Sequence, residues 1–265
     1  MRTTHWLLTA IFGLLLMGCA GAPTAPTPEA RQALAPTGKL RVAVLVAAIY
    51  ATRDSATGEL KGVAVDLGKE LARRVGVPFE PVVYPNPGAL IGGAKSGQWD
   101  VALIGIDAER AAAIDFSAPY MEFEQGYLVR AGVSIATASD VDKTGIRVGV
   151  LEKSIADIHL SRTLKNATLL RAKSIAELSA LAEGGKADVI TLGKPGLFAI
   201  AAKQAGSRVL DGRIWVEQVG MAVPKGRNAA AAYVGKFVEE AKAEGLVKSA
   251  IERAGLRGVT VAPLK

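Results

Sequence analysis

The sequence predicts an α/β protein of two similar lobes, each a mostly parallel sheet flanked by helices. The first observation is a repeated strand, since the apolar run LRVAVL at residues 40–45 returns as IRVGVL at 146–151. The second is a repeated strand end, because SGQWDVALIGI is matched by GGKADVITLGK. In both copies an aspartate precedes the apolar strand, and a glycine, Gly105 or Gly193, ends it. A chain of 265 residues is long enough for two such lobes.

Helices are expected between these strands. Residues 62–77, GVAVDLGKELARRVGV, have an apolar face and end in a glycine, as helices commonly do. The runs NPGALIGGAKSG and SIAELSALAEGG supply a second helix to each lobe, and residues 228–256 form a pair of helices broken near Gly245. Ligands of such sheets bind beyond the carboxyl ends of the strands, so the strand-ending glycines predict a cleft between the lobes.

The N-terminus has the pattern of an exported, lipid-anchored protein. A charged start and an apolar stretch too short to span a bilayer predict a signal peptide over residues 1–18. The only cysteine, Cys19, follows at once in LMGC, which resembles a bacterial lipobox, so we expect Cys19 to be lipidated. Proline-rich residues 19–38 are predicted to be a tether rather than a packed element. The domain is therefore expected outside the cytoplasm, as a membrane-anchored lipoprotein.

Several classes of function are disfavoured by composition. The formal net charge is +7, but the basic residues are scattered, which argues against a nucleic-acid partner. Beyond the signal peptide only one histidine remains, His159, so neither a histidine-rich metal site nor a Ser-His-Asp triad is expected. No phosphate-binding or dinucleotide-binding glycine motif occurs in a suitable context, and we predict no cofactor.

Specific blocks of the sequence resemble a known family. The pattern G-x-x-x-D-L at 62–67 and above all ER…DFSAPY at 109–120 are similar to the family 3 extracellular solute-binding proteins, the polar amino acid receptors of ABC importers. The resemblance covers the chain from Lys39 onward. It implies a non-enzymatic, monomeric receptor that binds a small solute, closes by a hinge motion and docks on an ABC permease in the inner membrane.

The fold implied by this resemblance is that of a type II periplasmic binding protein, in which two crossover segments join the lobes. We place the crossovers near residues 127–132 and 218–224. Lobe 1 is then expected to comprise residues 39–129 and 223–265, and lobe 2 residues 130–222.

Arg110 is the central candidate for ligand binding. In the family the matching arginine binds the α-carboxylate of the ligand, and a guanidinium group suits that task because it pairs with a carboxylate through parallel hydrogen bonds. Gly105 ends the strand just before it. The alternative is a surface arginine paired with Asp107 or Asp115.

Other positions depart from the family pattern. Asp107 stands where a threonine usually donates to the carboxylate, and Gly193, followed by Lys194, replaces the aspartate that receives the α-ammonium. Two hypotheses follow. Asp107 could hold an ammonium group, or the ligand could be a small organic acid bound by Arg110, Lys153 and Lys194. We favour the organic acid, because the usual carboxylates are missing.

Further candidates come from two loops. Ser154 could donate to the ligand, cap a helix, or do both, and Tyr50 could supply an aromatic surface. A dehydratase similar to cyclohexadienyl dehydratase is an alternative function, which would need a general acid such as Asp107 or Glu152. A ligand sensor without transport is another alternative.

Overall fold

The computed structural model describes residues 24–265, and the predicted signal peptide and its cysteine lie outside this range. The repeated runs of the sequence are equivalent strands. In the first half β1 (Leu40–Leu45) pairs in parallel with β5 (Val101–Gly105), and in the second half β7 (Arg147–Leu151) pairs in parallel with β9 (Val189–Gly193). The predicted α/β class with two similar lobes is confirmed.

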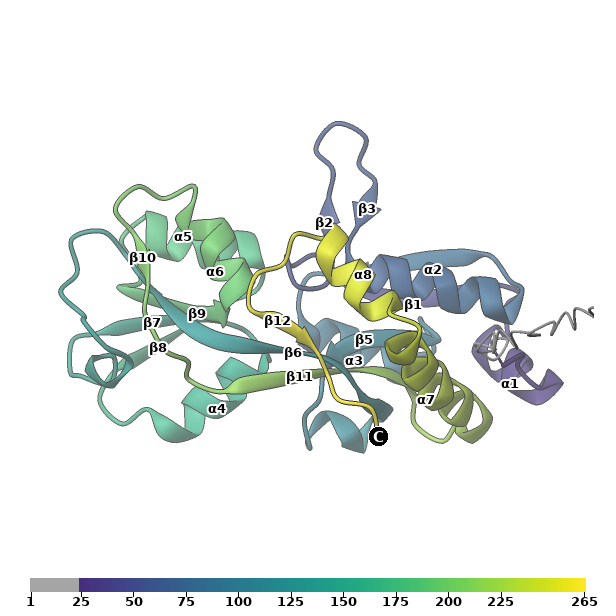
Figure 1. Ribbon diagram of the computed structural model, residues 1–265. Coiled ribbons are helices and arrows are strands. Elements are labelled where there is room, and N and C mark those ends of the chain that lie inside the picture. Colours follow the sequence, from purple (N-terminus) through teal and green to yellow (C-terminus); the bar gives the residue numbers. More distant parts are fainter. Residues whose placement is uncertain (1–23) are drawn as a thin grey trace, which may run out of the picture.

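Figure 1 shows the two lobes side by side, with helices packed around the strands of each. The first lobe contains, in chain order, α1 (Pro28–Leu34), β1, β2 (Thr52–Arg53), β3 (Leu60–Lys61), α2 (Val63–Val75), β4 (Phe79–Tyr84), α3 (Pro87–Lys95), β5, the 3₁₀ turn η1 (Arg110–Ala112), α7 (Asn228–Ala243), α8 (Leu246–Arg253) and β12 (Val259–Val261). The second lobe contains η2 (Ala138–Asp140), β7, α4 (Ile155–Thr163), β8 (Thr168–Ala172), α5 (Ile175–Glu183), β9, α6 (Lys194–Ala201) and β10 (Arg208–Val209).

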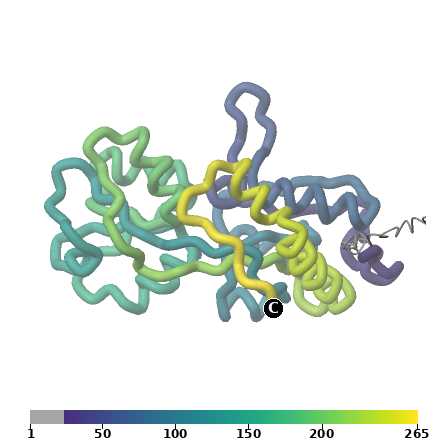
Figure 2. The backbone as a smooth tube through the Cα atoms, in the orientation of Figure 1, coloured from purple at the N-terminus to yellow at the C-terminus, as the bar shows by residue number. Residues whose placement is uncertain are grey.

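Two long strands connect the lobes, β6 (Ile114–Val129) and β11 (Val216–Pro224). The strand order is β4-β1-β5-β11-β6-β9-β7-β8, so the parallel trio of each lobe lies on either side of an antiparallel central pair. The backbone tube follows both strands from one lobe into the other (Figure 2). The carboxyl ends of β5 and β9 therefore approach the same space between the lobes.

The point at which the chain changes lobe is visible in the pairing of β6. Up to Glu124 this strand pairs with β11, and from Gln125 it pairs with β9. Tyr127 and Val129 pack in the second-lobe core, whereas Val219 packs in the first-lobe core. We propose the lobe boundary on β6 at this change of partner, which precedes the boundary expected at residue 129.

The packing of each lobe follows the periodicity of its sequence. Helix α2 buries Leu67, Leu71 and Val75 against the first sheet and ends at Gly76, whose φ of 74° is the left-handed conformation that glycine adopts without strain. The helix pair predicted at the C-terminus is α7 followed by α8, and Gly245 lies between them. Within residues 24–265, no helix is both long and apolar enough to cross a bilayer.

The predicted tether is wrong over part of its length, because Pro28–Leu34 form the helix α1. Thr27 caps this helix by accepting a hydrogen bond from the N–H of Ala30 at 3.1 Å, and Pro28 suits its first turn. Leu34 is fully buried in the first-lobe core. The tyrosine hydroxyl of Tyr233 on α7 donates to the carbonyl of Thr24 at 3.0 Å. Alanine and leucine at helical spacing outweigh the proline-rich composition here.

Candidate functional site

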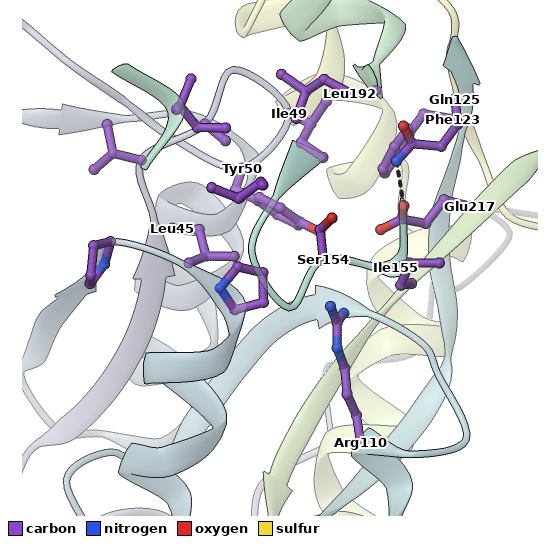
Figure 3. Close-up of a pocket in the computed structure, with 17 residues that line it drawn as sticks. Leu45, Ile49, Tyr50, Arg110, Phe123, Gln125, Ser154, Ile155, Leu192 and Glu217 are labelled. Atoms are coloured by element: carbon purple, nitrogen blue, oxygen red, sulfur yellow. Dashed lines mark hydrogen bonds between the residues drawn. The ribbon is translucent and has the colours of Figure 1, made fainter. Parts of the chain in front are cut away.

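A pocket lies between the lobes, at the carboxyl ends of β5 and β9 (Figure 3). Most of its lining is apolar, and the polar groups are few and face one another across it. The lining residues are Leu45, Val46, Ala47, Ile49, Tyr50, Pro85, Pro87, Arg110, Phe123, Gln125, Leu151, Ser154, Ile155, Ile175, Leu192, Gly193 and Glu217. An apolar cleft with a few convergent polar groups is the usual form of a small-molecule site.

Arg110 is a pocket residue with a side chain held in place by carbonyl oxygens. It is only 6% exposed. Its Nη1 donates to the carbonyl of Gly105 at 2.8 Å, and its Nη2 donates to the carbonyl of Lys153 at 3.1 Å. The remaining N–H donors of the guanidinium make no hydrogen bond to residues 24–265 and would suit an anion. Arg110 begins only a 3₁₀ turn, η1, so a helix dipole contributes little to binding an anion here.

Through the carbonyl of Lys153, the second lobe contacts Arg110 of the first. Lys153 has a φ of 57°, the left-handed conformation that non-glycine residues seldom adopt. Two further contacts join the lobes at the cleft rim. The amide of Asn86 donates to the carbonyl of Lys173 at 3.1 Å, and Arg162 pairs with Glu109. The structure is therefore a closed arrangement of the lobes.

Sequence reasoning missed the acidic group of the pocket, Glu217 on β11. Its side chain lies across the pocket from Arg110 (Figure 3) and is buried, and one carboxylate oxygen accepts a hydrogen bond from Gln125 Nε2 at 2.5 Å. Burial raises the pKa of Glu217, and the nearby Arg110 partly opposes that rise. The side-chain hydrogen bonds of Arg110 go to carbonyls and that of Glu217 comes from an amide, so within residues 24–265 neither side chain forms a direct ion pair, although Arg110 is near enough to act on the pKa of Glu217.

Gln125 adds an acceptor beside Glu217. Its side chain is 5% exposed, and with its Nε2 facing the carboxylate, its Oε1 has no hydrogen-bond partner among the described residues. A buried acceptor without a donor is uncommon in folded proteins and is often a ligand contact. The signal for both residues is in the sequence: alternation places Glu217 on the buried face of β11 and Gln125 on that of β6.

The strand-ending glycines leave room for this arrangement. A Cβ atom at Gly105 would overlap the carboxylate of Glu217. A Cβ atom at Gly193 would lie 2.7 Å from the ring of Phe123. An aspartate at position 193 would therefore require that ring to move.

Several predicted site residues lie elsewhere. Asp107 does not line the pocket: it accepts hydrogen bonds from the N–H groups of Glu109 at 2.9 Å and Arg110 at 3.3 Å, which fixes the turn that carries Arg110. The amine of Lys194 pairs with Glu124 at 2.7 Å. Lys153 contributes its carbonyl to Arg110 and does not line this pocket, although it lines an adjoining hollow that Arg110 and Pro87 also border. Side-chain direction, which residue number does not reveal, separates these groups from the site.

Tyr50 and Ser154 do line the pocket. Tyr50 is buried, and burial together with the Glu217 carboxylate raises the pKa of its hydroxyl. Ser154 accepts a hydrogen bond from the N–H of Asp157 at 3.1 Å and caps α4, so its capping role is established while its hydroxyl also borders the pocket. Among residues 24–265, no three histidine, cysteine, aspartate or glutamate side chains gather in a group that could hold a metal.

A two-lobed α/β fold with a mostly apolar pocket between its lobes is typical of solute receptors. The chain belongs to the bacterial extracellular solute-binding proteins, family 3, which residues 40–255 match. One relative is the ABC transporter glutamine-binding protein GlnH of Bacillus subtilis. It is 24% identical over 204 residues, which cover 74% of this chain and 73% of the relative.

Solved structures of this kind share the fold. A variant of ArgBP from T. maritima has a TM-score of 0.76 and 27% identity, and the match covers 85% of this chain and 99% of that one. The ancestral amino acid-binding protein AncCDT-1, a precursor of cyclohexadienyl dehydratase, has a TM-score of 0.74 and 25% identity, covering 84% of this chain and 98% of the other.

Proposed function

We propose that the chain is the amino-acid receptor of an ABC importer and binds the zwitterionic head group of its ligand between Arg110 and Glu217. The observation that carries this proposal is the pair of buried, opposite charges on facing walls of one pocket, neither paired within the described part of the chain. A buried charge without a partner is costly, and a ligand with both charges would satisfy both.

The pocket has polar groups suited to both the α-carboxylate and the α-ammonium group of an amino acid. The free N–H donors of Arg110 would bind the α-carboxylate, with the Ser154 hydroxyl and the start of α4 on the same side of the pocket. The carboxylate of Glu217 and the free Oε1 of Gln125 would accept from the α-ammonium. Glu217 thus takes the role that an aspartate at position 193 would have.

This proposal replaces the organic acid favoured by the sequence. That hypothesis assumed a pocket without a carboxylate and with two lysine amines. Glu217 supplies a carboxylate, Lys194 is paired with Glu124, and the Lys153 amine does not line the pocket. The matched amino-acid-binding relatives agree with the zwitterion.

The receptor would act outside the cytoplasm, as a monomer held to the membrane through Cys19. Ligand bound to Arg110 on the first lobe would add contacts to Ser154 on the second and so favour the closed form. The closed form would then dock on a permease. Replacing Cys19 by alanine should move the protein from the membrane fraction to the soluble fraction.

Binding is tested with the full-length protein in detergent, by calorimetry against a panel of amino acids. For the tightest ligand, analogues lacking the ammonium or the carboxylate are measured beside it. We expect each truncation to weaken binding, and a ligand at about 100 times its Kd to stabilise the protein by about 2.7 kcal/mol. A deaminated acid that binds as tightly as the amino acid would contradict the proposal and restore the organic-acid receptor.

Two variants test which pocket residue binds each charged group of the ligand. Arg110→Met should weaken binding on the order of 100-fold, because a desolvated charge-assisted contact is lost. Glu217→Gln should abolish the preference for the amino acid over its deaminated analogue. Arg213→Met and Glu122→Gln are the matched controls, since neither residue lines the pocket.

A prephenate assay tests the alternative function, a dehydratase. Asp107 and Glu152 do not line the pocket, so the general acid would be Glu217. Turnover of prephenate by the wild type that is lost in Glu217→Gln would identify the protein as a dehydratase.

A further inference from the structure

The part of the pocket that remains after the head group is placed has almost no polar groups. Arg110, Glu217, Gln125 and Ser154 serve the charged head. Apart from the buried hydroxyl of Tyr50, the other walls are aliphatic, prolyl or aromatic; they are Leu45, Val46, Ala47, Ile49, Pro85, Pro87, Phe123, Leu151, Ile155, Ile175 and Leu192. A ligand side chain would lie against these walls.

Both lobes contribute to this apolar wall. Leu45 ends β1 of the first lobe and is 5% exposed, while in the second lobe Leu151 ends β7 and Leu192 precedes the last residue of β9. Phe123 comes from β6, between them. Closure of the lobes would therefore remove water from every side of a ligand side chain.

Apart from the Tyr50 hydroxyl, a polar or charged ligand side chain would find no partner there. The amines of Lys153 and Lys194, which could neutralise an acidic side chain, do not line the pocket. The carboxylate in the pocket lining is Glu217, which the head group engages. An amide or hydroxyl buried against Leu45 and Leu192 would lose its hydrogen bonds to water without replacement.

We infer that the receptor selects amino acids with aliphatic side chains over polar ones of the same shape, and that Leu45 and Leu192 set this preference. The inference rests on the proposed binding of the zwitterionic head. An aliphatic side chain gains burial on all sides, whereas a polar side chain of equal volume gains the same contacts and loses its hydration.

Isosteric pairs of amino acids test the inference by calorimetry on the full-length protein. Valine is compared with threonine, and leucine with asparagine, so that shape is held nearly constant while polarity changes. We expect the apolar member to bind at least about tenfold more tightly in each pair that binds, since an apolar pocket discriminates against an added polar group by that order. Threonine or asparagine binding as tightly as its partner would overturn the inference while leaving the head-group proposal intact. Failure of every amino acid to bind would overturn both.

A variant then tests which residue sets the preference. Leu192→Asn introduces an amide at a half-buried position of the wall, and the ratio of leucine to asparagine affinities should fall by about tenfold or more. Leu170→Asn is the matched control, because Leu170 is also half-buried in the second lobe but does not line the pocket. An unchanged ratio in Leu192→Asn would show that Leu192 does not set the preference.

Discussion

The molecule contains buried charges of two kinds, in the frames of the lobes and in the cleft between them. In the first lobe Asp100 accepts from the Arg41 guanidinium at 2.8 and 2.9 Å and from its backbone N–H at 3.1 Å. In the second lobe Asp188 makes the same contacts with Arg147, at 2.7, 2.9 and 3.0 Å. The aspartates that open the repeated strand motif therefore build the same arginine clamp twice.

The cleft differs in that its charges are not paired with each other. Each clamp aspartate also has a second arginine, Arg227 on Asp100 and Arg130 on Asp188. Arg110 and Glu217, by contrast, rely on neutral partners. The difference suggests how to separate structural from functional charges: the clamp charges are satisfied by the fold, and in our proposal Arg110 and Glu217 are satisfied by a ligand.

The largest effect on stability is expected when an arginine clamp loses its aspartate carboxylate. Asp100→Asn leaves Arg41 and Arg227 without their carboxylate at a fully buried position, and the free energy of unfolding should fall by about 3–5 kcal/mol. Urea denaturation measures this loss. Asp66→Asn is the control, since its pair with Arg253 is exposed and is worth under about 1 kcal/mol. A loss in Asp100→Asn no larger than in the control would mean that the clamp is not structural.

Acid should weaken ligand binding through Glu217. Its pKa is raised by burial, so it takes up a proton at a higher pH than an ordinary glutamate, and the neutral acid no longer attracts an ammonium group. Below that pKa we expect affinity to fall by up to about tenfold per pH unit. Calorimetry between neutral pH and pH 5 in wild type and Glu217→Gln gives the comparison. A pH-dependence that survives in the variant would assign it to another group.

The free energy of unfolding should depend on pH with opposite signs through Glu217 and through Asp188. Glu217 has a raised pKa in the folded state, so its contribution is present at low pH and is lost as pH rises. Arg147 lowers the pKa of Asp188 from 3.8 to about 2, so that contribution is present above pH 4 and is lost on acidification. At neutral pH, Glu217→Gln should therefore raise the free energy of unfolding of the ligand-free protein by on the order of 1 kcal/mol. A fall in Tm would contradict this.

The smallest effect is expected at Asp107. Its carboxylate holds the turn before Arg110 and does not reach the pocket, so Asp107→Ala should cost about 1 kcal/mol of stability or less. Ligand affinity should change by less than about threefold, well under the effect of Arg110→Met. Loss of affinity as large as that of Arg110→Met would place Asp107 in direct contact with the ligand.

Local patterns in the sequence were enough to predict much of the fold. The repeated strands and their aspartate and glycine ends identified β1, β5, β7 and β9, because buried parallel strands are short continuous apolar runs. The helix α1 was not predicted, since proline and threonine dominate the composition around it. Its packing depends on α7, which begins at Asn228, and Thr24 just before α1 likewise hydrogen-bonds Glu240 on α7, 216 positions later in the sequence.

The site was only partly predictable. Arg110 was found from the block that contains it, but Glu217 and Gln125 were not, although strand alternation places both on buried faces. What the sequence could not show is that β6 and β11 lie side by side between the lobes, which brings these residues together. Lys153 and Lys194 do not line the pocket, and Lys194 pairs with Glu124 instead, because proximity along the chain does not fix the direction of a side chain.

The attachment of α1 also determines where mechanical load would enter the molecule. Thr24 contacts Glu240 on α7, and Glu240 pairs with Arg74 on α2 at 2.9 Å. In the proposed membrane-anchored receptor, a pull on the chain ahead of Thr24 would thus be received by helices of the first lobe. The first lobe would then stay in place relative to the membrane, and the second lobe would be the part that moves when the cleft opens.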